Sequence, residues 1–485
     1  MWHFATTHEP VQLVLPDTQR FLNALNEQSD FFTPDRPLHV GRAPGRLDLM
    51  GGVADYSGSL VLELPLGVAT WVAVQSTDEP EITLLSTSID PGFGQLRVSL
   101  PCSALQMDHR ALEYGEAHAL LTATSDSAWA AYVVGVLVLL QHERGLSLER
   151  GLRCFIYSEV PTGKGVSSSA AIEVATMQAV AGLFDFALDG RELALFCQQV
   201  ENLIVGAPCG VMDQMTSACG VQNSLLALLC QPAEVQASVA LPAEVEVWGI
   251  DSGVRHAVTG ADYGSVRVGA FMGYRIIAEL ASLETRQLKG GLVSVQDERW
   301  QGYLANIPPS LWESAYREHL PEWLSGADFL ERYGGFTDSV THIVSQRDYA
   351  VRRPTAHPIY EHHRVQLFRA LLAQRPANEE QLILLGELMY QSHASYSACG
   401  LGSSGTDRLV ELVSEAGSVA GLYGAKITGG GSGGTVAVLA RRGSGEQIKR
   451  LAERYSQETG RDIEILHGSS PGAVAWGRQQ MLYSA

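Results

Sequence analysis

The sequence predicts an α+β protein in two halves, and three observations support this prediction. Strand-like and helix-like stretches are mixed along the 485 residues, without the regular alternation of a doubly wound parallel sheet. Turn-forming residues at 231–233 and at Pro242 mark a boundary between the halves. A chain of this length also usually divides into two or three domains. The expected divisions are an extension at 1–37, a first domain at 38–235, a second domain at 236–485 and, within the second, an inserted region at about 285–355.

The first half is expected to combine a sheet with helices. Hydrophobic residues with Gly and Pro interruptions run from Leu38 to Gly67, which is typical of strands and turns. Residues 152–157 show the alternation of a strand. Helical patterns then cover 169–184 and 191–205, and both end at plausible stop signals.

The second half repeats this mixture with weaker patterns. The expected elements are a short strand at 248–251, helices at 265–283 and 359–372, and strands at 425–428 and 435–439. The inserted region at 285–355 shows no clear periodicity.

Composition excludes several classes of protein. Asp and Glu outnumber Lys and Arg by 53 to 34, which gives a formal charge of −19. Because nucleic acids and anionic membranes attract basic surfaces, we expect neither as a partner. The longest uncharged apolar run, 128–140, is shorter than the roughly 20 residues that span a bilayer, so we interpret it as a buried helix.

The cysteines indicate a reducing compartment. All seven are scattered and no C-x-x-C pair occurs, so neither a disulfide framework nor a zinc site is expected. The amino terminus has no Lys or Arg before Arg20, which is unlike a secretory signal. We therefore expect a cytoplasmic protein.

A glycine–serine segment at 161–171, Pro-Thr-Gly-Lys-Gly-Val-Ser-Ser-Ser-Ala-Ala, follows the strand at 152–157 and leads into a helix. Glycines let the backbone approach a ligand closely, and the first amides of a helix attract anions. The segment is therefore a candidate phosphate loop, and a capped helix after a tight turn is the alternative. It is neither a Walker A loop, since Gly165 follows Lys164, nor a dinucleotide loop, since Ser168 replaces the third glycine.

A second glycine-rich segment, 428–434, contains the spacing G-x-G-x-x-G. A strand follows it instead of a helix, so the context of a dinucleotide-binding turn is missing. Two interpretations stay open: a simple glycine turn, or a backbone loop packed beneath the phosphate loop.

These two segments and Gly41-Arg-Ala-Pro-Gly-Arg-Leu-Asp-Leu-Met-Gly51 occur in an order that resembles the GHMP kinases, and within them the galactokinase branch. The segments 51–58, 205–215 and 354–361 are most similar to the kinase domain of plant L-arabinokinases. The resemblance implies a two-domain α+β GHMP kinase fold, with the active site in the cleft between the domains and with ATP and Mg²⁺ as cofactors.

The resemblance also implies roles for individual residues. Asp213 falls on the catalytic aspartate, and Arg46 on the arginine that would keep that carboxylate ionised and stabilise charge on the transferred group. Ser168 and Glu201 fall on the magnesium ligands. The expected ATP-binding residues are Gly163, Lys164, Gly165, Val166, Ser167, Ser168, Ser169 and Ala170.

Sugar contacts are expected at Asp55, Gly210, Asp213 and Tyr263. Galactokinases carry Glu-His where this chain has Gly52 and Val53, and the resemblance implies that this Glu contacts the sugar's 6-hydroxyl. L-arabinopyranose is galactopyranose without its CH₂OH group. The sequence therefore predicts a kinase acting on the anomeric hydroxyl, with L-arabinose preferred and L-arabinose 1-phosphate as product.

Several alternatives stay open at this point. The chain could be a galactokinase, a uronic-acid 1-kinase or a non-catalytic sugar-binding regulator. Lys164 could neutralise phosphate or be solvated, and Trp129 and Tyr132 are expected to pack in a helix instead of meeting adenine. For His357, His362 and His363 we expect surface or capping roles. The expected partners are a small-molecule sugar and ATP, in a monomer or homodimer.

Overall fold

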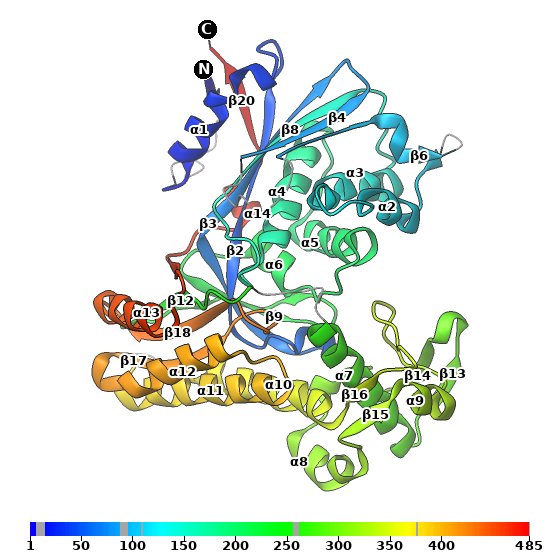
Figure 1. The fold of residues 1–485 in the computed structure, drawn as a ribbon, viewed down its shortest axis with the longest axis vertical. Helices are drawn as coiled ribbons and strands as arrows, with labels where there is room; N and C mark the ends of the chain where they lie inside the picture. Colours follow the sequence, from blue (N-terminus) through cyan, green and yellow to red (C-terminus); the bar gives the residue numbers. More distant parts are fainter. Residues whose placement is uncertain (6–14, 88–95, 108–109, 256–260, 375–376, 485) are drawn as a thin grey trace.

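The computed structural model describes residues 1–485 except 6–14, 88–95, 108–109, 256–260, 375–376 and 485. Two sheets organise the molecule, one in the upper and one in the lower part of Figure 1. The α+β prediction is confirmed: neighbouring strands are antiparallel in both sheets, except that β4 and β8 run parallel. No helix in the described ranges is both long and apolar enough to span a membrane.

The first sheet is built mainly from long hydrophobic strands. In spatial order its main path is β1 (Trp2–Phe4), β20 (Gln479–Tyr483), β2 (Leu38–Met50), β3 (Leu60–Thr77), β8 (Gly151–Ser158), β4 (Glu81–Ser86) and β5 (Arg97–Pro101). The strand β9 (Ser224–Leu229) pairs with β3 and carries the short strands β10 (Glu234–Val235) and β11 (Val239–Ala240).

Helices of the first half cover one face of this sheet. The helix α4 (Ser168–Leu183) packs directly on β2 and β3. Its many Ala, Val and Met side chains suit this position, because the helix is buried on nearly all sides. Around it lie α2 (Tyr114–Leu121), α3 (Ala131–Arg144), α5 (Gly190–Gln199) and α6 (Met212–Cys219). The predicted helix at 191–205 changes winding within its span, since α5 continues as a π-helix at Val200–Val205.

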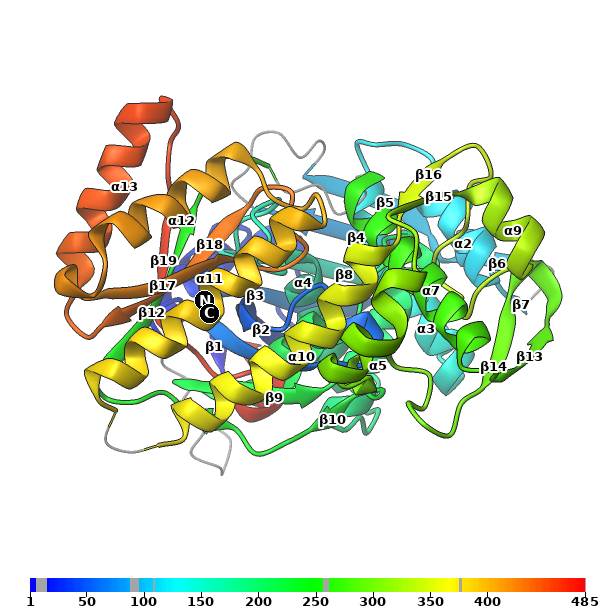
Figure 2. The ribbon, with the colours of Figure 1, turned by 90° about the horizontal axis from the view of Figure 1, so that it is seen from below.

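The second sheet has the order β17 (Leu422–Ile427), β18 (Thr435–Arg441), β12 (Val245–Asp251) and β19 (Ile465–His467). The helices α10 (Arg352–Leu372), α11 (Glu379–Ala398), α12 (Ser404–Ala416) and α13 (Gly445–Thr459) lie beside it (Figure 2). One hydrophobic core contains both Leu62 of the first sheet and Leu439 of the second, so the two halves are packed together.

The region expected to be irregular, 285–355, packs around α7 (Ala261–Leu280) at one side of the molecule (Figure 1). Its core joins Tyr274 of α7 to Trp312 and Phe329. Its elements are short, which explains why no periodicity was visible. They are β13 (Glu284–Gln287, which begins one residue earlier), β14 (Val293–Gln296), α8 (Pro309–Leu311), β15 (Trp323–Ser325), α9 (Gly326–Tyr333) and β16 (Asp348–Ala350).

The described parts of the segment expected to be an extension, residues 1–5 and 15–37, are packed onto the first sheet. Its strand β1 pairs with β20, which comes from the end of the chain, so the two termini lie side by side (Figure 1). Its helix α1 (Thr18–Glu27) stacks Phe21 on Trp71, with ring centroids 4.5 Å apart. The first sheet therefore contains both ends of the chain, a pairing that no local pattern could reveal.

Candidate active site

The phosphate loop has the predicted strand–loop–helix geometry. Strand β8 ends at Ser158 and α4 begins at Ser168. Gly163, Gly165 and Ser167 have positive φ angles of 69°, 70° and 61°. These left-handed turns bring the chain abruptly into the first turn of α4, whose free amides form an anion site.

A cavity of about 630 Å³ opens over this loop. Its lining joins the predicted ATP, metal and sugar residues from segments far apart in the sequence. The predicted residues on its walls are Arg46, Asp55, Gly163, Lys164, Gly165, Ser167, Ser168, Ser169, Glu201, Gly210, Asp213 and Tyr263. Gly52, Val53, Val166 and Ala170 are buried and are not part of this lining.

The second glycine-rich segment packs beneath the phosphate loop, as one of its two interpretations predicted. Thr435, at the start of β18, donates both its amide and its hydroxyl to the carbonyl oxygen of Lys164, each at 2.9 Å. A Cβ atom at Gly434 would lie 2.6 Å from the same oxygen, and one at Gly429 would lie 2.8 Å from that of Gly165. Glycine is therefore required at both positions.

Arg46 joins the candidate catalytic aspartate to the phosphate loop. Its Nε and Nη2 atoms lie 2.8 and 2.7 Å from Oδ1 of Asp213, in the first turn of α6. Its Nη1 atom donates to the carbonyl oxygen of Gly165 at 2.7 Å. The guanidinium is almost completely buried, whereas the Asp213 side chain is 21% exposed and faces the cavity.

Sequence reasoning missed Glu63, which lies beside this pair. Its Oε2 atom is 3.4 Å from Nε of Arg46, and burial, with Asp48 nearby, raises its pKa well above the usual range. Glu63 faces Asp48 across β2 and β3, and no local signal marks it as a site residue.

Lys164 is partly exposed on the cavity wall, but its ammonium group is paired within the protein. Its ammonium group forms an ion pair with Asp251, which is buried at the end of β12. Oδ1 of Asp251 also accepts the amide of Gly253 at 3.1 Å. The phosphate loop is thus held to the second sheet by an ion pair as well as by Thr435.

Glu201, the candidate metal ligand, sits in a buried polar cluster in the cavity wall. Gln214 donates to Glu201 at 2.5 Å and to Glu173 at 3.2 Å, and the hydroxyl of Ser169 also hydrogen-bonds to Glu201. Burial and the charge of Asp213 raise the pKa of Glu201 to about 7.

These oxygens fit a magnesium ion, which prefers hard oxygen ligands. Ser168 and Glu201 line the same wall, and Oε1 of Glu173 is buried without a hydrogen-bond partner among the described residues. Glu173, which the sequence analysis did not single out, is buried behind Gln214 and is not itself part of the cavity lining. It was detectable as the one acid in the apolar helix α4, one turn after Ser169.

Asp55 and Gly210 form the other end of the cavity. Oδ1 of Asp55 is buried and has no hydrogen-bond partner within the described ranges, so it is available to a ligand hydroxyl. Burial and the nearby charge of Asp213 raise the pKa of Asp55 to about 6. A Cβ atom at Gly210 would lie 1.7 Å from Oδ2 of Asp55, so only glycine fits there. Tyr263 of α7 closes this end.

The space above Gly52 is filled by protein. A Cβ atom there would lie 2.1 Å from both Oδ2 of Asp48 and the hydroxyl of Tyr396. Asp48 is fully buried and pairs with Nζ of Lys426 at 2.7 Å, while the Tyr396 hydroxyl donates to Asp48 at 3.1 Å. The sequence did not single out Asp48 and Lys426 as partners, because they are separated by 378 positions.

The histidine prediction is wrong for His357, which is buried beside Gly52 and not at the surface. Its Nε2 donates to the Gly52 carbonyl at 3.1 Å, and its Nδ1 accepts from Ser395 at 2.7 Å. His362 lies inside α10 and caps no helix end, but its Nδ1 accepts the amide of Leu60, the first residue of β3, at 2.9 Å. His363 is exposed, as expected. Trp129 and Tyr132, for which helix packing was preferred over a role near adenine, line the main cavity.

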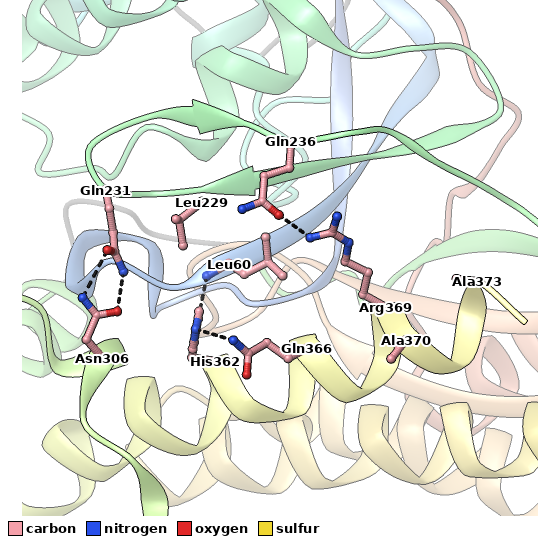
Figure 3. Close-up of a pocket in the computed structure, with 10 residues that line it drawn as sticks. All are labelled: Leu60, Leu229, Gln231, Gln236, Asn306, His362, Gln366, Arg369, Ala370 and Ala373. Carbon is pink, nitrogen blue, oxygen red and sulfur yellow. Dashed lines mark hydrogen bonds between the residues drawn. The ribbon is translucent and has the colours of Figure 1, made fainter. Parts of the chain in front are cut away.

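A second cavity of about 390 Å³ lies between β9 and α10 (Figure 3). Its polar side chains are bonded largely to one another. Gln231 and Asn306 exchange amide hydrogen bonds of 2.8 and 3.1 Å, and Arg369 donates to Gln236. We interpret this cavity as part of the packing between β9, α10 and the 285–355 region.

Comparisons with known proteins agree with this geometry. Residues 131–221 match the GHMP kinases N terminal domain, residues 368–457 match the GHMP kinases C terminal domain, and residues 28–76 match the galactokinase galactose-binding signature. The chain belongs to the GHMP kinase family.

Within the family, two groups of relatives are informative. The chain is 44% identical to the L-arabinokinase of Arabidopsis thaliana over 92% of its own length, and spans about half (47%) of that protein. It is 29% identical to the galactokinase of Chloroflexus aggregans, covering 89% of this chain and 91% of that one. The fold is shared with the galactokinase of Lactococcus lactis solved with galactose, at a TM-score of 0.69 and 18% identity over 93% and 99% of the two chains.

Proposed function

We propose that this protein transfers the γ-phosphoryl group of ATP to the anomeric hydroxyl of a monosaccharide. The observation that carries the proposal is the contact of Arg46 with both Asp213 and the Gly165 carbonyl. One buried guanidinium thereby fixes the distance between a carboxylate that can hold a hydroxyl and a loop that can hold phosphates. Phosphoryl transfer depends mostly on such positioning and on charge stabilisation.

The phosphate end of the cavity accounts for ATP. The amides of the first turn of α4 face the cavity and attract the phosphates, and the loop glycines let the backbone come close. Trp129 and Tyr132 on the same cavity offer aromatic surface for the base. A bound Mg²⁺, held by Ser168 and Glu201, would neutralise phosphate charge.

The other end of the cavity accounts for the sugar. Asp213 accepts the proton of the attacking hydroxyl or holds that hydroxyl in line with the phosphate. The buried Oδ1 of Asp55 accepts a hydrogen bond from a second hydroxyl. Tyr263 packs against the ring face, and the absence of a side chain at Gly210 lets the Asp55 carboxylate lie against this backbone at the cavity wall.

L-arabinose is the proposed substrate. The chain lacks a side chain at Gly52, and the place of that side chain is taken by Asp48 and Tyr396. The resemblance to galactokinases implies a glutamate at this position that contacts the 6-hydroxyl of galactose, and without it that hydroxyl loses a polar partner, at a cost of about 1–3 kcal/mol when buried. The 44% identity to a protein named L-arabinokinase supports the same choice.

Two rival functions are less well supported. A uronic-acid kinase needs a cation near C6, but the nearby cations are paired with carboxylates of the protein. The pairs are Arg46–Asp213, Arg42–Asp17, Lys426–Asp48 and Arg267–Asp338. A non-catalytic regulator is disfavoured because the phosphate loop, Arg46, Glu201 and Asp213 share one cavity. Galactose stays the strongest alternative substrate. The cytoplasmic location and the monomeric or homodimeric state stay predictions.

The test is a panel of free sugars with ATP and Mg²⁺, scored by ADP release. We expect turnover with L-arabinose to exceed that with galactose in kcat/KM, and D-glucuronate to be inactive. A higher kcat/KM for galactose would contradict the argument from Gly52. Release of no ADP above background with any sugar of the panel would contradict the kinase proposal itself.

A further inference from the structure

A buried ion pair connects the 285–355 region to helix α7. Nε and Nη2 of Arg267 donate to the two carboxylate oxygens of Asp338, both at 2.8 Å. The two residues are only 5% and 4% exposed. Such a two-pronged contact fixes the plane of the guanidinium as well as its position.

The third nitrogen of this guanidinium, Nη1, points to the end of the main cavity where we place the sugar. Nη1 of Arg267 donates to the carbonyl oxygen of Cys209 at 3.1 Å, and the guanidinium carbon lies 5.3 Å from the ring centroid of Tyr56. Cys209 immediately precedes Gly210, and Tyr56 immediately follows Asp55. Arg267 therefore contacts a residue next to Gly210 and a residue next to Asp55.

Asp338 is itself held rigidly. It accepts the Val340 amide at 3.1 Å, the Thr341 amide at 3.3 Å and the Thr341 hydroxyl at 2.6 Å. A carboxylate with this many donors stays ionised, and its pKa is lowered despite burial, chiefly because Arg267 and Thr341 donate to it. The ion pair is thus preformed before any ligand binds.

The same region also supports the segment after Asp55 from a second side. The ring of Tyr303 occupies the space where a Cβ of Gly58 would lie, with Cδ1 at 2.4 Å from that point. Gln231 donates to the Gly58 carbonyl at 2.7 Å and is paired with Asn306 of the inserted region (Figure 3). The Asp55–Gly58 turn is therefore held by Tyr303 and Gln231 at Gly58 and by Arg267 at Tyr56.

We propose that the 285–355 region is the support of the sugar subsite, and that Asp338 acts as a positioning residue. Asp338 holds Arg267, and Arg267 in turn fixes the position of the Cys209–Gly210 backbone relative to the Asp55–Tyr56 turn. This inference rests on the proposed function, because it assigns the sugar to Asp55 and Gly210. A mispositioned contact weakens sugar binding and leaves the distant phosphate loop unchanged.

The test is Asp338→Asn, which keeps the shape of the side chain and removes its charge. We expect the KM of the preferred sugar to rise about tenfold or more, since small misplacements in a binding site cost one to two orders of magnitude. The KM of ATP should stay within about twofold. Calorimetric binding of the sugar without ATP should weaken in parallel.

The matched control is Asp297→Asn in the same region. Asp297 also accepts a hydrogen bond from α7, from the Tyr274 hydroxyl at 2.7 Å, and caps the amides of residues 299, 300 and 302. None of these partners touches Asp55 or Gly210 in the described structure. The Asp297→Asn variant should therefore lower the melting temperature without changing the KM of the sugar.

The outcomes separate the two proposals. If the wild-type protein turns over no sugar, the proposed function fails. If the wild type is active and Asp338→Asn keeps the sugar KM within about twofold, the positioning role is wrong and the function stands. Should Asp338→Asn not fold, Arg267→Lys decides the question, because lysine retains the charge but cannot bridge Asp338 and Cys209. An unchanged sugar KM in Arg267→Lys overturns the proposal.

Discussion

Nη2 of Arg46 lies 2.7 Å from Oδ1 of Asp213, although the two residues are separated by 167 positions. Arg46 belongs to β2 in the first sheet, and Asp213 to the first turn of α6. The same guanidinium also binds the phosphate loop at Gly165. The position of the Asp213 carboxylate relative to the glycine–serine loop is therefore fixed by the protein itself, without a ligand.

The first prediction concerns Asp213. Replacement by Asn keeps the size of the side chain but removes its ability to accept a proton, so kcat should fall about 10²–10⁴-fold. The KM of ATP should change little, because Asp213 is not part of the phosphate loop. Steady-state kinetics with the preferred sugar measure both values. An Asp213→Ala enzyme with full turnover would refute the mechanism.

The second prediction concerns the Lys164–Asp251 ion pair. Lys164→Met leaves the buried Asp251 carboxylate without its cation, which should cost about 1–3 kcal/mol of stability. The double variant Lys164→Met, Asp251→Asn should recover most of that loss. Denaturant unfolding of the wild type, both single variants and the double variant gives the coupling energy. Additive losses would show that Lys164 has another role, such as binding phosphate directly.

The third prediction is a pH dependence caused by Asp55. Its pKa is raised from 3.8 to about 6 by burial and by Asp213. Between these values the folded protein keeps a proton that the unfolded chain has lost, so this group's contribution to stability becomes less favourable as pH rises to 6. Above pH 6 the penalty is constant.

Asp55→Asn removes that penalty, since an amide does not titrate. Its stability relative to wild type should therefore increase by about 1.4 kcal/mol between pH 5 and pH 7.5, which corresponds to one pKa unit. Denaturant unfolding at both pH values measures the difference. The same variant should lose sugar binding, so stability and function change in opposite directions. An equal difference at both pH values would show that Asp55 is not perturbed.

The fourth prediction concerns Gly52. Alanine there would place Cβ 2.1 Å from Asp48 and from Tyr396, and overpacking of this kind should cost about 1–3 kcal/mol. Gly115→Ala is the matched control, because a Cβ at this position in α2 meets no atom within 4 Å. It should be neutral or slightly stabilising. Melting temperatures of the two variants test this. Equal values would mean that Asp48 and Tyr396 can move away to accommodate the added methyl group.

Much of the local architecture could be predicted from the sequence. The strand at 152–157, the phosphate loop and the helix after it were expected within a residue or two of β8 and α4. Their patterns are local, because alternation, glycine turns and helix periodicity act over a few residues. The 285–355 region escaped this reasoning, since its strands and helices are too short to show a period.

The sequence alone determined the two-half α+β fold, the phosphate loop and the small residues around it, because these depend on neighbouring side chains and on glycine's freedom to adopt positive φ. Only the tertiary structure decided that Lys164 is bound to Asp251, that Asp48 pairs with Lys426 and fills the space above Gly52 together with Tyr396, and that Asp338 holds Arg267 beside Cys209. Each of these pairs joins segments that meet only when the sheets and α7 pack together. Each partner needs the other because a buried charge without its counter-charge is strongly destabilising, and no periodicity in the chain records this requirement.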